Sequence, residues 1–119
     1  FEGTSPEHIL GLAKAADLRD RLELVAGDVL ETAIKFVEEN PGFRISLLHL
    51  DLDAYAGTKA VLEAFYDRIV TGGIIVCDQY GGHKWGESDA VDEFLRDRGV
   101  PVKAIPHSRA PTAYFVKPA

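Results

Sequence analysis

The sequence contains one cysteine, no basic block and no long apolar run. A lone Cys77 excludes an internal disulfide and suits a reducing compartment, so we expect a cytoplasmic protein. Cys and His pairs at ligand spacing are lacking, which argues against a structural zinc site. No segment approaches the roughly 18 apolar residues of a membrane span. The opening residues FEGTSPEHIL lack the basic start and apolar middle of a secretion signal.

The charge is acidic and evenly distributed, with a formal net value of -6. Proteins that bind a nucleic-acid backbone rely on clustered Lys and Arg, so we exclude nucleic acid as a partner. The charge is compatible with a cationic ligand such as a metal or a sulfonium, and equally with simple solubility. The 119 residues show no linker and are 46% hydrophobic, which indicates one globular domain or part of one.

Helical and strand-like patterns alternate along the chain and predict an α/β layered sheet. Thr4 and Glu7 have capping-box spacing, and Ser88 and Gly99 have the types expected to bound a later helix. The run at 45–51 is almost continuously apolar, as expected of a parallel strand covered on both faces. We expect helices at about 5–16, 29–40, 58–70 and 88–98, strands at 21–27, 45–51 and 73–80, and an antiparallel pair within 100–118.

Three successive predicted strands end in acid, at Asp28, at Asp51 with Asp53, and at Asp78. A single Asp after a strand is commonly a helix cap or turn residue, and that interpretation stays open for each. In a parallel sheet, however, ligands bind outside the carboxyl ends of the strands. Asp51 and Asp78 with the amide oxygen of Gln79 make an oxygen donor set suited to Mg²⁺. Such an ion lowers the pKa of a bound hydroxyl.

Other candidates lie in and around the segment YGGHKWGE. His83 could act as a general base or bind a sugar, or be an ordinary exposed loop residue. Trp85 could stack on a sugar face or anchor the loop, and Tyr80 is a candidate substrate contact. Tyr55 could contact substrate at the head of the helix expected from Thr58, for which capping is the simpler role.

Four further residues have simpler expected roles. We expect His49 to be a hydrogen-bonded core histidine and Cys77 to be a small buried hydrophobe. Arg109 and Lys84 could meet a phosphate, but solvation is the simpler interpretation.

The segments HLDLDAY, GGIIVCDQYGGHKWG and AVDEF together resemble the macrocin-type sugar O-methyltransferases, which use S-adenosylmethionine (SAM). In that family an LDxDxY segment ends strand four and a GGxxxxDDY segment ends strand five. FEGTSPE resembles the segment after strand two, and LVAGD resembles the end of strand three. Within the family, the resemblance points to the branch that modifies TDP-rhamnose in enediyne (calicheamicin) biosynthesis.

The resemblance implies a Rossmann-like class I methyltransferase domain, three-layered αβα with an antiparallel final strand. Residues 1–119 would be its C-terminal part, lacking the first two strands, the glycine-rich loop and the ribose-binding acid, so that alone it should hold SAM poorly. The resemblance implies that Asp51 and Asp78 bind Mg²⁺ and that Asp51, or a base near it, deprotonates the sugar. Gly27 and Asp28, with Asp51, would contact SAM. Gln79 departs from the family, which usually has a second Asp there.

The sequence therefore predicts a SAM- and Mg²⁺-dependent O-methyltransferase acting on a sugar or nucleotide-sugar hydroxyl. We expect no membrane partner and a homo-oligomeric protein. A catechol-type or caffeoyl-type methyltransferase, in which a metal ion likewise lowers the pKa of the acceptor hydroxyl, remains an alternative. So does a non-catalytic Rossmann-like module that docks through a sheet edge. A dehydrogenase is a third option. Its G-x-G-x-x-G fingerprint is missing, which is uninformative for a truncated chain, but the DQY strand end fits methyl transfer better.

Overall fold

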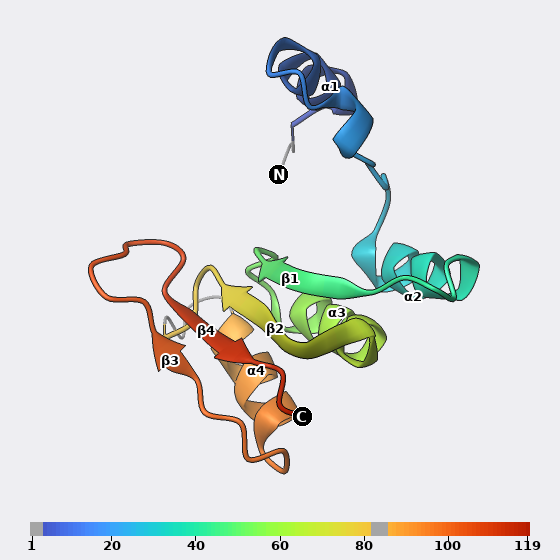
Figure 1. The fold of residues 1–119 in the computed structure, drawn as a ribbon. Helices are drawn as coiled ribbons and strands as arrows, with labels where there is room; N and C mark the ends of the chain where they lie inside the picture. Colours follow the sequence, from blue (N-terminus) through green and yellow to red (C-terminus); the bar gives the residue numbers. More distant parts are fainter. Residues whose placement is uncertain (1–3, 82–85) are drawn as a thin grey trace.

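A computed structural model describes residues 4–81 and 86–119 of the chain (Figure 1). In these ranges no helix is both long and apolar enough to cross a bilayer. The elements are α1 (Pro6–Ala15), η1 (Arg19–Arg21), α2 (Val29–Glu39), β1 (Ile45–Leu50), α3 (Tyr55–Phe65), η2 (Tyr66–Arg68), β2 (Ile69–Cys77), α4 (Glu87–Leu95), β3 (Lys103–Ala104) and β4 (Ala113–Val116).

The sheet has four strands in the order β1-β2-β4-β3. β1 and β2 are parallel, with α3 as the crossover between them. β4 runs antiparallel to both β2 and β3, as the Pro-rich turn between the last two strands predicts. The α/β class with an antiparallel end is therefore confirmed.

The helices α2, α3 and α4 lie on one face of the sheet, whereas α1 stands apart on the other side (Figure 1). The core forms between these helices and the sheet, because alternate strand residues point toward them. Its fully buried members include Leu50, Leu62, Ile75, Val91 and Phe115.

The opposite sheet face is open to solvent over β1 and β2. Leu47 and Ile74, which are cross-strand neighbours, are 61% and 39% exposed. The expectation that the apolar 45–51 run is covered on both faces is therefore wrong for the chain as described. Its apolar residues on the helix side, such as Leu50, are the ones that the core buries.

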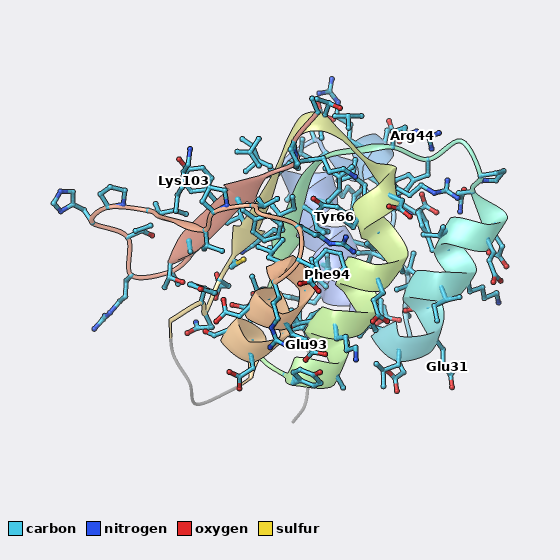
Figure 2. All side chains as sticks on the ribbon, turned by 90° about the horizontal axis from the view of Figure 1, so that it is seen from below. Glu31, Arg44, Tyr66, Glu93, Phe94 and Lys103 are labelled. Atoms are coloured by element: carbon cyan, nitrogen blue, oxygen red, sulfur yellow. The ribbon has the colours of Figure 1, made fainter. Side chains whose placement is uncertain are left out.

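An aromatic contact joins the end of α3 to α4. The rings of Tyr66 and Phe94 meet edge to face, with centroids 5.0 Å apart, where the end of α3 meets α4 (Figure 2). The Arg98 guanidinium lies over both rings, and the Lys117 ammonium lies 4.0 Å from the Tyr66 ring centre. Lys117 also donates a hydrogen bond to the Tyr66 carbonyl, which ties the end of β4 to this contact.

The strand predicted at 21–27 is not formed. The 3₁₀ turn Arg19–Arg21 occupies its start, and the following residues run extended without pairing to another strand in the described ranges. Alternating apolar residues indicate an extended chain, but a strand also needs a neighbour to receive its backbone hydrogen bonds.

The boundary between α3 and β2 also differs from the prediction. The helix expected at 58–70 begins at Tyr55 and ends at Phe65, and β2 begins at Ile69. Gly72 and Gly73, which follow the end of the expected helix, lie inside β2, where Gly72 has φ +82° and the pairing with β1 shifts register. A Cβ on Gly73 would meet the Ile69 side chain at 2.6 Å. These glycines therefore mark an irregularity in a strand.

Two helix starts also differ. Ser5, not Thr4, caps α1 by accepting a hydrogen bond from the His8 amide. Gly86 in a left-handed conformation precedes α4, so Ser88 lies inside the helix and is not its cap. α4 ends at Leu95, four residues before Gly99. A helix start depends on the path of the preceding loop, and sequence types do not fix that path.

The difference between the buried and the open face of the sheet can be tested by measuring stability. Leu62→Ala is expected to lower the free energy of unfolding by about 2–5 kcal/mol, because it removes a fully buried side chain from the core. The matched substitution Leu47→Ala on the open face should change it by no more than about 0.5 kcal/mol. Urea denaturation of both variants checks this. Equal losses would show that the open face is covered in the protein.

Candidate functional site

The candidate site lies where β1 and β2 end side by side. Leu50 and Cys77 are the last paired residues of the two strands, and the Asp78 amide donates to the Leu50 carbonyl at 3.0 Å. The next residue after β1 is Asp51 and the next after β2 is Asp78. Parallel pairing in this register therefore brings the two carboxylates to the same edge of the sheet.

The electrostatics of Asp51 reflect this crowding. Burial raises its pKa, and the negative charges of Asp78 and Asp53 raise it further. A hydrogen bond between the Asp51 and Asp78 side chains acts in the same direction, whereas His49 lowers the pKa. Two carboxylates this close repel one another when both are ionised, so a cation between them would relieve the repulsion.

His49 belongs to this site and not to the core. Its Nε2 lies 3.3 Å from Asp78 Oδ1, and its side chain is 49% exposed. The expectation of a buried core histidine is therefore wrong, because His49 projects from the open face of the sheet, next to Val76 of β2. The sequence signal was available, since His49 lies two residues before Asp51 and shares its strand face.

Both the backbone amide and the side-chain amide of Gln79 donate hydrogen bonds. Its side-chain amide donates to Asp78 Oδ2 at 3.1 Å, and its backbone amide donates to Glu87 Oε2 at 2.6 Å. Through the first contact the amide group lies beside the Asp78 carboxylate.

Glu87 is a residue that sequence reasoning missed. It is fully buried at the start of α4, and its Oε1 has no hydrogen-bond partner among the described residues. Burial raises its pKa, the Gln79 amide lowers it, and the charges of Asp78, Asp53 and Asp51 raise it. An acid in the first turn of a helix is ordinary, so no local pattern indicates that this one faces the strand ends.

The candidate tyrosines both bind acids on α4. The Tyr55 hydroxyl donates to Glu93, whose other oxygen lies 3.6 Å from the Lys59 ammonium. The Tyr80 hydroxyl donates to Asp92 at 2.6 Å, which raises the pKa of Tyr80 to about 12. Both hydroxyls thus have partners within the protein, and their substrate roles remain predictions.

Gly27 and Asp28 form the start of α2. Asp28 Oδ1 accepts from the Leu30 amide and caps the helix, so the capping interpretation holds for this acid. Gly27 has φ +135°, and a Cβ there would meet the Thr32 side chain at 2.8 Å. Both residues are exposed, and the cap uses one of the two Asp28 oxygens. A contact with a cofactor stays a prediction.

The remaining candidates separate clearly. His83, Lys84 and Trp85 lie outside the described residues. Arg109 is exposed, as expected of a solvated basic residue. Cys77 is buried, and burial raises the pKa of its thiol to about 12, so it is a small hydrophobe and not a nucleophile.

An open apolar cavity of about 430 Å³ lies away from the strand-end acids. It lies beside α2, the segment before it and α3, and its lining includes Val25, Phe36, Phe43 and Phe65 but none of the candidate site residues. Within residues 4–81 and 86–119, no group of three or more His, Cys, Asp and Glu side chains is arranged to hold a metal ion. The site therefore offers two neighbouring carboxylates and an amide.

The family model described as macrocin-O-methyltransferase (TylF) matches residues 17–114. The chain belongs to this family. The match spans β1, β2 and the acids that follow them, and the expected family resemblance is thereby confirmed. No curated protein sequence matches the chain.

Solved structures agree with the family. The apo structure of CalS11, described as TDP-rhamnose 3'-O-methyltransferase of calicheamicin biosynthesis, is 35% identical with a TM-score of 0.75 over 92% of this chain and 50% of that chain. A second CalS11 structure gives 35% identity and a TM-score of 0.76, covering 92% and 44%. The O-methyltransferase NovP, at 23% identity and a TM-score of 0.81 over 98% and 46%, supports the fold alone. The chain thus spans about half the length of these proteins.

The coupling of the two acids can be measured. Asp78→Asn is expected to lower the pKa of Asp51 toward its ordinary value, because it removes a neighbouring negative charge. Carbon-detected NMR titration of the carboxyl groups reports this directly. Asp89→Asn, which removes an exposed charge from α4, should leave the pKa of Asp51 unchanged. Equal effects of the two substitutions would contradict the pairing.

The raised pKa of Asp51 also determines how this residue changes the stability of the protein with pH. The pKa of Asp51 is higher in the folded than in the unfolded chain, so its contribution to stability is present below the unfolded pKa. It is lost as the pH rises through the folded pKa. Asp51→Asn should therefore leave stability at neutral pH equal or higher, and remove this part of its pH dependence.

Proposed function

We propose that this chain forms part of a SAM-dependent O-methyltransferase that methylates a hydroxyl of a sugar or nucleotide-sugar. The observation that carries the proposal is the Asp51–Asp78 pair at adjacent strand ends, in a member of the macrocin O-methyltransferase family. CalS11, the relative at 35% identity, supports a sugar nucleotide as the acceptor. A role in antibiotic biosynthesis is part of the proposal on the same basis.

The donor set fits Mg²⁺. This ion usually keeps several waters and is bound through one or two carboxylates together with the substrate. Asp51 and Asp78 supply two carboxylates whose mutual repulsion raises the pKa of Asp51. The Gln79 amide group donates to Asp78 through its nitrogen, and its oxygen would be the third donor. When bound, Mg²⁺ lowers the pKa of an acceptor hydroxyl.

The fit to SAM is partial. Gly27 and Asp28 are exposed at the start of α2, and one Asp28 oxygen remains outside the capping interaction. These two residues, with Asp51, would contact the cofactor. SAM supplies the electrophilic methyl group on its sulfonium.

The chain's own residues would position the acceptor and receive its proton. Asp51 would receive the proton of the acceptor hydroxyl, since a carboxylate next to the acceptor can act as a general base. His49 Nε2 lies 3.3 Å from Asp78 Oδ1 and can hold that carboxylate in place.

Mg²⁺ binding tests the metal part of this proposal. Calorimetric titration of the full-length protein with SAM bound is expected to show saturable Mg²⁺ binding that Asp51→Asn abolishes, because one of two carboxylate ligands is removed. Asp89→Asn is the matched loss of one charge and should bind Mg²⁺ as the unmodified protein does. Absence of binding in every form would contradict the metal mechanism.

The acceptor class needs a separate assay. Methyl transfer from labelled SAM to a TDP-deoxysugar is expected, and Asp78→Asn should reduce it strongly. Transfer to a catechol in preference to the sugar would identify the phenol-methylating alternative. No transfer to either class, with SAM and Mg²⁺ bound, would point to the non-catalytic module.

A further inference from the structure

The turn that carries Asp78 and Gln79 is bound to the first turn of α4. Glu87 Oε2 accepts a hydrogen bond from the Gln79 amide at 2.6 Å, and Ser88 Oγ accepts one from the Gly81 amide at 2.7 Å. Both side chains are buried, with Glu87 at 0% and Ser88 at 2% exposure. Two successive residues of α4 thus hold two backbone amides of the turn that follows β2.

Gly86 fixes where this contact forms. It pairs with Ala54 in an isolated antiparallel bridge and has φ +89°. A Cβ at this position would come within 3.0 Å of Tyr55, so the start of α4 packs closely against the start of α3. The loop that follows Asp51 and the helix that presents Glu87 are therefore held together by backbone.

Burying a glutamate costs folding free energy, so a buried Glu87 indicates that this position needs a carboxylate. Burial of a carboxylate is unfavourable, and its neighbours here include Asp51, Asp53 and Asp78. A nonpolar residue in the first turn of α4 would avoid that cost, but it would leave the Gln79 amide without this acceptor. The start of a helix partly offsets the charge, since the helix dipole favours an anion there.

We propose that Glu87 is a positioning residue, which holds the Asp78–Gln79 turn in the conformation that binds the divalent cation at the strand ends. This inference rests on the proposed function. Glu87 acts through the Gln79 backbone, and Asp78 and the Gln79 side chain contact the ion. Groups that orient metal ligands typically change metal affinity by about 10–100-fold when they are removed.

Four forms of the full-length protein test this role. Glu87→Ala removes the acceptor and should weaken Mg²⁺ binding by about 10–100-fold, measured calorimetrically with SAM bound. Glu87→Gln keeps an acceptor oxygen and should bind Mg²⁺ nearly as well as the unmodified protein. Asp89→Asn removes an exposed charge from the same turn of α4 and should leave both Mg²⁺ affinity and thermal stability unchanged.

A second readout does not involve the metal. Hydrogen exchange at the Gln79 amide, followed by NMR in the presence of EDTA, should be slow in the unmodified protein and in Glu87→Gln. It should become fast in Glu87→Ala, because the amide has lost its acceptor. Circular dichroism melting identifies any variant that fails to fold. If Glu87→Ala does, Glu87→Asp, which shortens the side chain that accepts from the Gln79 amide, replaces it in both measurements.

The outcomes separate the two proposals. Slow exchange of the Gln79 amide in folded Glu87→Ala would overturn the contact itself. Fast exchange with unchanged Mg²⁺ affinity would overturn the positioning role and leave Glu87 a structural residue. Absence of Mg²⁺ binding in the unmodified protein would overturn the metal part of the proposed function and the positioning role with it, while the exchange result would still decide the contact.

Discussion

The parallel pairing of β1 with β2 is the constraint on which the rest of the site depends. Because Leu50 and Cys77 are in register, the first residue beyond each strand is an aspartate at the same edge of the sheet. The hydrogen bond from the Asp78 amide to the Leu50 carbonyl extends this pairing to the site itself. A shift of one residue would turn alternate side chains to the other face and separate the two acids. The buried core beneath the helices fixes the register, since it needs Leu50, Ile75 and Cys77 on its side.

The strand-end acids crowd one another at this edge of the sheet. Asp51 has a raised pKa because of burial and of like charges nearby, and Glu87 is buried among the same acids. Crowded acids of this kind are typical of functional sites, where groups are held in positions that folding alone would not favour. Contacts with the surrounding residues hold these acids in place. Glu87 and Ser88 hold the turn after β2, and Thr112 from the start of β4 donates to the Tyr80 carbonyl at 2.7 Å.

The sequence located the acids at the strand ends better than it predicted the detailed fold. Apolar runs that end in acid located Asp51 and Asp78, because the core-facing residues of β1 and β2 are apolar and the charged residues follow where the strands end. The prediction failed at 21–27, where a strand pattern had no partner, and at Gly72 and Gly73, which bend a strand. His49 and Glu87 were missed as site residues for a related reason. Their roles depend on which strand face is open and on how α4 approaches the turn, and neither is encoded by local pattern.

The central claim is that Asp51 and Asp78 form one cation site. Crystals of the full-length protein soaked with Mn²⁺, an oxygen-binding ion with an anomalous signal, test it most directly. The account predicts one anomalous peak at bonding distance from both carboxylates, and its loss in Asp51→Asn. A well-ordered pair of carboxylates with no peak between them, or a peak held by other residues, would contradict it.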